Sequence, residues 1–284
     1  MPLKQAITGA EAVAYAMKQI NPDVVAAYPI TPQTPVVEYF AKYVADGVVD
    51  TEMIPVESEH SAMSAVVGAA ASGARAFTAT ASVGLALMHE VVFIAASLRL
   101  PIVMAVANRA LSGPINIHCD HSDAMAERDS GWIQLWAENA QEAYDFTVMA
   151  YKIAEHKDVR LPVMVNFDGF IISHGVEVVE TLDDELVKNF VGKQEKIYPL
   201  LDTSNPVTYG SIDMYDYYFE HKRQQIEAMK HVPRVFKEIA EEFAKISGRK
   251  YDLVDGYMLD DAEYVMVALG STAGTIKHTI NELR

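Results

Sequence analysis

The chain has 284 residues, half of them apolar, and its 23 Lys and Arg residues stand against 39 Asp and Glu residues, a formal net charge of −16. This acidic balance argues against nucleic-acid backbones and anionic membrane surfaces as partners. No apolar run approaches the roughly 18 residues of a membrane span, and the beginning, MPLKQAITGAEA, lacks the apolar core of a signal peptide.

Through the first 175 residues, short β-rich apolar runs alternate with segments of helical periodicity. The predicted strands are Val24–Tyr28, Met53–Val56, Arg75–Thr80, Pro101–Ala107, Trp132–Trp136 and Pro162–Phe167. The predicted helices are Gly9–Ile20, Pro35–Ala45, Glu59–Ala71, Leu85–Ala96 and Ala140–Glu155. The strands are continuous apolar runs, which is typical of a parallel sheet covered by helices on both faces. The sequence therefore predicts an α/β fold with a doubly wound parallel sheet.

The pattern changes from Val176 onward. Residues 176–202 are acidic and predicted to be extended, and Met214–Ile246 reads as a long charged helix. A second apolar run, Tyr264–Leu269, predicts a new buried strand, followed by the start of a helix. We therefore expect one domain over residues 1–256, with a core at 1–175 and a wrapping helical extension at 176–256. Residues 257–284 are expected to begin a second α/β domain that is incomplete here.

The stretch AYPITPQTP at residues 27–35 follows the first predicted strand and contains two Thr-Pro pairs. Pro is favoured at the first helical position, and Thr just before it can cap the helix. This places the cap on Thr34 and the helix start on Pro35, which leaves Thr31 at the carboxyl edge of the sheet, where ligands bind in such folds. The alternative is that both pairs only stiffen the turn.

Two further charged positions lie at the same predicted edge. In PVESEHS, Ser58 is a natural helix cap, and Glu57 and Glu59 complement the positive end of the helix dipole. Either carboxylate could instead face a ligand. Arg109 ends the strand PIVMAVA, where its planar side chain could form a salt bridge or clamp a substrate carboxylate.

The run His118-Cys119-Asp120-His121, with Asp123 nearby, contains metal-ligating residue types. Adjacent residues cannot all point at one ion, so hydrogen bonding within a loop is the simpler interpretation and no metal site is predicted. Cys119 is the one cysteine of the chain, which excludes an internal disulfide and fits a reducing cytoplasm. It also excludes an iron–sulfur cluster held by this chain alone, because such clusters need several Cys ligands.

Four segments together resemble the alpha subunit of the 2-oxoacid:ferredoxin oxidoreductases, most closely the pyruvate type. They are AYPITPQTP, VESEHSAMSAVVGAAASGARAFTATASVGLALMHE, PIVMAVANRALSGPINIHCDHSDAMAERDSGWIQ and LPVMVNFDGFIISH. The resemblance implies that the domain is the pyrimidine-binding half of a thiamine diphosphate site. A partner beta subunit would hold the diphosphate and its Mg²⁺, and this chain indeed lacks the GDG motif with a later Asn pair that binds them.

The same resemblance implies roles for individual residues. The catalytic carboxylate falls on Glu59, which would hydrogen-bond to N1′ of the aminopyrimidine and favour its imino tautomer. The substrate-contacting threonine falls on Thr31, and the arginine after the fourth strand falls on Arg109; both would bind the substrate carboxylate. Asn139 lies at a matching position near the site, but it could equally be a helix cap.

The implied reaction is the oxidative decarboxylation of pyruvate with coenzyme A to acetyl-CoA, CO2 and reduced ferredoxin, or its reverse. Electrons would leave through iron–sulfur clusters on partner subunits of beta, gamma and delta type. Three alternatives stay open: a subunit specific for 2-oxoisovalerate or another 2-oxoacid, a transketolase-like transferase half, and a non-catalytic interaction subunit that has kept the fold.

Overall fold

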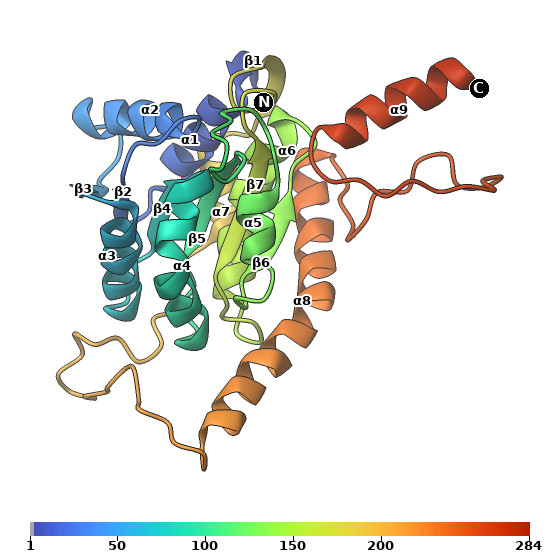
Figure 1. The fold of residues 1–284 in the computed structure, drawn as a ribbon. Helices are drawn as coiled ribbons and strands as arrows, with labels where there is room; N and C mark the ends of the chain where they lie inside the picture. Colours follow the sequence, from blue (N-terminus) through green and yellow to red (C-terminus); the bar gives the residue numbers. More distant parts are fainter. Residues whose placement is uncertain (1–2) are drawn as a thin grey trace.

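A six-stranded parallel sheet forms the centre of the computed structural model, which describes residues 3–284 (Figure 1). The strand order is β3-β2-β4-β5-β7-β6. The strands are β2 (Val24–Ala27), β3 (Glu52–Pro55), β4 (Ala76–Thr80), β5 (Val103–Asn108), β6 (Ile133–Trp136) and β7 (Val163–Asp168). The helices among them are α1 (Gly9–Ile20), α2 (Thr34–Ala45), α3 (Glu59–Ala71), α4 (Ser82–Ser97), α5 (Ser122–Ala126) and α6 (Ala140–Glu155).

Alternate residues of the strands supply two separate apolar cores, one on each face of the sheet. On one face Val103 and Ala105 of β5 belong to a core shared with α1, α2 and α6. On the other face Met104 and Val106 pack with α3 and α4. Successive side chains of a strand point to opposite faces, so a continuous apolar run is what two covered faces require. The predicted doubly wound fold is confirmed, and its predicted elements are present with shifted ends.

A second, two-stranded antiparallel sheet joins β1 (Leu3–Thr8) to β8 (Val176–Thr181). The sequence did not predict either strand, because both are half exposed and each lacks a strong apolar pattern of its own. The region expected to be extended also contains a helix, α7 (Asp184–Val191), which Asp183 caps by accepting from the N–H of Glu185.

The long helix α8 (Tyr218–Ser247) is confirmed, and it packs against α6 through residues including Val235 and Phe236. Just after α8, Arg249 donates to the buried Asp145 of α6 through Nε and Nη2, at 2.6 and 2.7 Å. This charged pair fixes the end of α8 on the first domain.

The prediction of a buried strand at Tyr264–Leu269 is wrong for the described structure. The segment has no strand conformation, and Tyr264 and Val267 are 92% and 88% exposed. An apolar strand needs a neighbour to satisfy its backbone, and neither sheet in residues 3–284 provides one here. Helix α9 (Thr272–Leu283) follows. The domain division at residue 256 stays a prediction.

Within residues 3–284, no helix is long and apolar enough to cross a membrane.

Candidate active site

The turn before α2 places Thr31 at the carboxyl edge of the sheet, but the helix starts differently from the prediction. Thr34 is the first residue of α2, Pro35 is the second, and Gln33 takes the cap position without a side-chain cap bond. Gln33 Oε1 instead accepts from the N–H of Ile30 at 3.2 Å, so this side chain closes the turn itself. The predicted capping role of Thr34 is therefore wrong, while Thr31 is exposed at the edge as expected.

Glu59 is the first residue of α3 and is 7% exposed. Ser58 caps the helix by accepting from the N–H of Ser61 at 3.2 Å, which confirms that predicted cap. Gly84, in the first turn of α4, lies directly against the carboxylate. A Cβ at residue 84 would lie 2.7 Å from Glu59 Oε1 and 2.6 Å from Thr80 Oγ1, so only glycine fits there. Glu57, unlike Glu59, is exposed, and its carboxylate accepts a hydrogen bond from Ser61 Oγ.

Arg109 follows β5 and is 6% exposed. Its Nη1 donates to the backbone carbonyl of Thr31 at 2.6 Å, so the structure brings together the two residues expected to bind substrate. Arg109 Nε is buried and has no hydrogen-bond partner among residues 3–284. A buried unpaired donor costs about 1–3 kcal/mol, which makes this N–H available to an incoming acceptor.

Asp123 connects the parts of the site, although the sequence suggested it only as a loop residue. Its Oδ2 accepts from the N–H of Ser82 at 2.9 Å and from the N–H of Arg109 at 3.0 Å. Its Oδ1 accepts from Asn108 Nδ2 at 3.0 Å. Burial raises the pKa of Asp123 against these hydrogen bonds, which lower it. The start of α4, which contacts Glu59, and the backbone of Arg109 are therefore fixed by one carboxylate.

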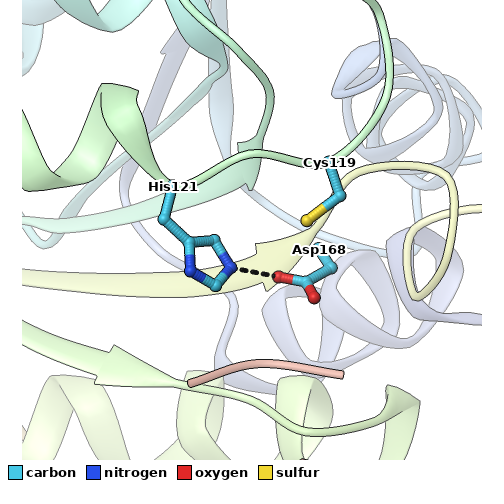
Figure 2. Close-up of side chains that lie close together, drawn as sticks. All are labelled: Cys119, His121 and Asp168. Carbon is cyan, nitrogen blue, oxygen red and sulfur yellow. Dashed lines mark hydrogen bonds and ion pairs between the residues drawn. The ribbon is translucent and has the colours of Figure 1, made fainter. Parts of the chain in front are cut away.

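The HCDH run separates in space, and only part of it forms a cluster (Figure 2). Ligand atoms of Cys119, His121 and Asp168 all lie within 4.8 Å of one another. His121 Nε2 is 2.7 Å from Asp168 Oδ1, and Asp168 Oδ2 accepts from the N–H and Oγ of Ser271 at 2.9 and 2.6 Å. Burial, together with the nearby Asp168, raises the pKa of the Cys119 thiol to about 12. These hydrogen bonds hold His121 and Asp168 in place beside Cys119.

Asn139 caps α6, where its Oδ1 accepts from the N–H of Glu142 at 2.9 Å. It follows β6, the edge strand, and β7 lies between β6 and β5. The structure thus gives direct support to the capping alternative and does not join Asn139 to the contact between Thr31 and Arg109.

The comparisons with known proteins agree on one family. Residues 15–241 match the family described as pyruvate flavodoxin/ferredoxin oxidoreductase, thiamine diphosphate-binding. The chain is 75% identical to the pyruvate synthase subunit PorA of Thermotoga maritima over 98% of its length and 71% of that protein. It is 56% identical to PorA of Methanocaldococcus jannaschii over 98% of its length and 72% of that protein.

One solved structure shows the same fold at low sequence identity. It is the 2-oxoglutarate:ferredoxin oxidoreductase of Magnetococcus marinus with 2-oxoglutarate, coenzyme A and succinyl-CoA bound. The TM-score is 0.71 at 19% identity, covering 99% of this chain and 51% of that one.

Proposed function

Because the chain belongs to the thiamine diphosphate-binding family of pyruvate flavodoxin/ferredoxin oxidoreductases, we propose that it is the alpha-type subunit of a pyruvate:ferredoxin oxidoreductase. With its partner subunits it catalyses the oxidative decarboxylation of pyruvate with coenzyme A to acetyl-CoA, CO2 and reduced ferredoxin, or the reverse. The observation that carries this proposal is the buried Glu59 carboxylate, enclosed by Gly84 at the same sheet edge as Arg109.

The residues present fit the pyrimidine half of thiamine diphosphate. Within residues 3–284 no hydrogen bond engages the Glu59 side chain, yet the residue is almost fully buried, so its carboxylate is available to a protonated ring nitrogen. Glu59 would bind N1′ and hold the proton there. When bound, the cofactor supplies a carbon nucleophile and an electron sink for the 2-oxoacid. Gly84 keeps α4 close enough to exclude water from the carboxylate, which strengthens the interaction in the low-dielectric interior.

Arg109 binds and orients the substrate carboxylate in this proposal. One of its donors is occupied by the Thr31 carbonyl at 2.6 Å, which holds the guanidinium in one orientation, while Nε is buried without a partner. A carboxylate oxygen would satisfy that donor with a charge-assisted hydrogen bond. The Thr31 hydroxyl lies on the same turn and contributes a further contact. Asn139 is left with its capping role.

The proposal requires partner subunits. One of beta type would hold the diphosphate and Mg²⁺, and subunits of beta, gamma and delta type would hold the iron–sulfur clusters and pass electrons to ferredoxin. The apolar side chains of Val83, Leu87 and Ile94 are exposed along α4, the helix that covers Glu59. Exposed large apolar groups gathered on one helix favour a protein contact, so we assign this face to the beta-type partner. The cytoplasmic setting remains a prediction from the sequence.

The test is a 2-oxoacid panel on the purified complex loaded with thiamine diphosphate. We expect reduction of ferredoxin or a viologen that requires both coenzyme A and a 2-oxoacid, with the highest kcat/KM for pyruvate. A higher kcat/KM for 2-oxoisovalerate would move the chain to the branched-chain type. Formation of a ketol product without electron transfer would support the transketolase-like alternative and contradict the proposal.

A further inference from the structure

A cavity of about 500 Å³ lies at the opposite edge of the sheet from Glu59. It is bounded by the carboxyl-terminal ends of α3 and α4, by the loops that lead into β5 and β7, and by part of the extended segment 193–210. In Figure 1 this segment leaves the body of the domain after α7 and runs beneath α3. The volume of the cavity falls within the range of small-molecule pockets, about 300–1,000 Å³.

The outer wall of this cavity is fixed by specific contacts. The N–H of Leu200 donates to the carbonyl of Ala71 at the end of α3, at 2.9 Å. Gly73 has a φ of +91°, and a Cβ there would lie 3.0 Å from Pro199 Cβ, so the segment packs directly on the turn after α3. Tyr209 Oη donates to the carbonyl of Tyr198 at 3.2 Å, which ties the two parts of the segment that line the cavity to each other.

Three cations line the cavity, and none of its lining residues is acidic, in a chain whose net charge is −16. They are Arg99, Arg160 and Lys196. Arg99 donates only to backbone carbonyls, at 2.6 Å to Val159, 3.0 Å to Arg160 and 3.3 Å to Gln224. Arg160 makes one long hydrogen bond, 3.5 Å from Nη1 to the carbonyl of Glu195. Within residues 3–284 neither guanidinium forms a salt bridge with a carboxylate.

The two guanidiniums also oppose each other. Burial lowers the pKa of Arg99, and the neighbouring charge of Arg160 lowers it further. Burial lowers the pKa of Arg160 as well, despite weaker opposite effects from Tyr209, Glu155 and the exposed Glu195. Glu155 is already bound by Arg75 Nε at 2.7 Å. Two half-buried like charges that no carboxylate pairs with directly are unfavourable, and an anion between them would remove that cost.

The helix ends do not reverse the sign of the site. The carboxyl termini of α3 and α4 each contribute roughly half a negative charge, which fades within about one turn. The three side chains contribute a full positive charge each, two of them half-buried and therefore weakly screened. The cavity is therefore electropositive.

We propose that this cavity binds a small phosphorylated metabolite through a diphosphate group. The planar fork of Arg160 matches phosphate oxygens in two-point hydrogen bonds, and Arg99 and Lys196 add positive charge beside it. Tyr198 and Tyr209 provide flat apolar surface for the group attached to the phosphates. The site lies at the amino edge of the sheet and is separate from the thiamine diphosphate site.

The test uses the assembled complex saturated with thiamine diphosphate and coenzyme A, so that the other diphosphate sites are filled. Isothermal titration with pyrophosphate, and separately with ADP, measures the remaining sites. We expect one site per chain, weakened by added salt and weakened about tenfold in Kd in Arg160→Gln and in Lys196→Gln. Lys193→Gln is the matched control, because Lys193 is exposed on the same segment but does not line the cavity.

Lys196 is exposed, so its substitution keeps the fold and isolates the loss of charge. Tighter binding of ADP than of pyrophosphate would show that Tyr198 and Tyr209 contact the nucleobase. Equal binding would show that the site recognises the phosphates alone. The proposal is overturned if the wild-type complex binds neither probe, if Arg160→Gln and Lys196→Gln bind as tightly as Lys193→Gln, or if citrate binds as tightly as pyrophosphate.

Discussion

Two polar groups lie at the carboxyl edge of the same sheet, and they differ in how completely their hydrogen bonds are satisfied. In the Cys119–His121–Asp168 cluster, one carboxylate oxygen of Asp168 accepts from His121 (Figure 2). The other accepts from Ser271. In the candidate active site, Arg109 Nε has no partner in the described structure and no hydrogen bond there engages the Glu59 carboxylate.

The difference separates a structural group from a binding group. The cluster joins β7, the loop after β5 and the start of α9, and both oxygens of Asp168 accept hydrogen bonds. In the candidate active site Glu59 and Arg109 are buried but their hydrogen bonds are incomplete. An incomplete buried polar group is unfavourable unless a ligand completes it. Variants of the site should therefore change activity more than stability, and variants of the cluster should do the opposite.

The largest effect is expected from Glu59→Gln. The amide keeps the shape of the side chain but cannot hold the N1′ proton, and a positioned acid–base group contributes about 10²–10⁴ in rate. We expect kcat of the complex to fall at least about a hundredfold, with little change in the thermal unfolding midpoint. Glu57→Gln, an exposed carboxylate two residues away, is the matched control and should keep full activity.

Arg109→Gln should act mainly on substrate binding. Loss of charge-assisted hydrogen bonds to a carboxylate, each worth about 1.5–3 kcal/mol, should raise KM for pyruvate about ten- to a hundredfold. The affinity for thiamine diphosphate, measured by titration, should be nearly unchanged. Arg109→Lys, which keeps the charge but not the planar fork, should recover only part of the loss. Collapse of cofactor binding in Arg109→Gln would contradict the assignment of Arg109 to the substrate carboxylate.

Thr31 and Thr34 form a second matched pair on one turn. Thr31→Ala removes a hydroxyl from the site edge, and we expect kcat/KM to fall about tenfold, the value of one hydrogen bond. Thr34 makes no cap bond, so Thr34→Ala should change the free energy of unfolding by less than about 0.5 kcal/mol. Steady-state kinetics and urea unfolding of both variants check this. A kinetic defect confined to Thr34→Ala would reverse the division of roles.

A modest effect on stability, with little effect on activity, is expected at the Cys119–His121–Asp168 cluster, and it depends on pH. The hydrogen bond that His121 donates to Asp168, together with the charge of Asp168, raises the pKa of His121 above the ordinary 6.5 despite burial. Burial of Asp168 raises its pKa, but hydrogen bonds from His121 and Ser271 outweigh that and lower it below 3.8. The pair therefore stabilises the fold most between these ordinary values. The stabilisation by the pair is lost as the pH rises through the pKa of His121. It is also lost as the pH decreases through the pKa of Asp168.

His121→Gln tests this directly. Urea unfolding of the wild type and the variant should differ by about 1 kcal/mol near pH 6, and the difference should shrink as the pH rises above the pKa of His121. Pyruvate turnover at pH 6 should remain close to wild type. A stability difference that does not change with pH would show that the pair makes no ionic contribution.

Much of the fold could be predicted because the information is local. Apolar runs of strand length, the cap at Ser58 and the helical periodicity of α1 are each visible within a few residues of sequence. The pairing of β1 with β8 could not be predicted, because it joins positions more than 160 residues apart and both strands are half exposed. The strand predicted at Tyr264–Leu269 is wrong because its apolar pattern is local, whereas a strand also needs a neighbouring strand to pair with.

The candidate site shows the same limit. Glu59, Thr31 and Arg109 could be named from their positions at strand ends and from a family resemblance. The connecting role of Asp123 could not, because it depends on backbone N–H groups of Ser82 and Arg109 that only the fold brings together. Thr34 was assigned a cap by residue preference, whereas the turn is closed by the side chain of Gln33.

Glu59 is proposed to set the acidity of C2 in bound thiamine diphosphate. The most direct measurement is deuterium exchange at C2 of the cofactor's thiazolium ring, followed by rapid quenching and NMR, in cofactor-saturated complexes carrying Glu59 or Glu59→Gln. We expect exchange to slow at least about a hundredfold in Glu59→Gln and to be unchanged in Glu57→Gln. Equal exchange rates in the wild type and in a cofactor-saturated Glu59→Gln complex would contradict it.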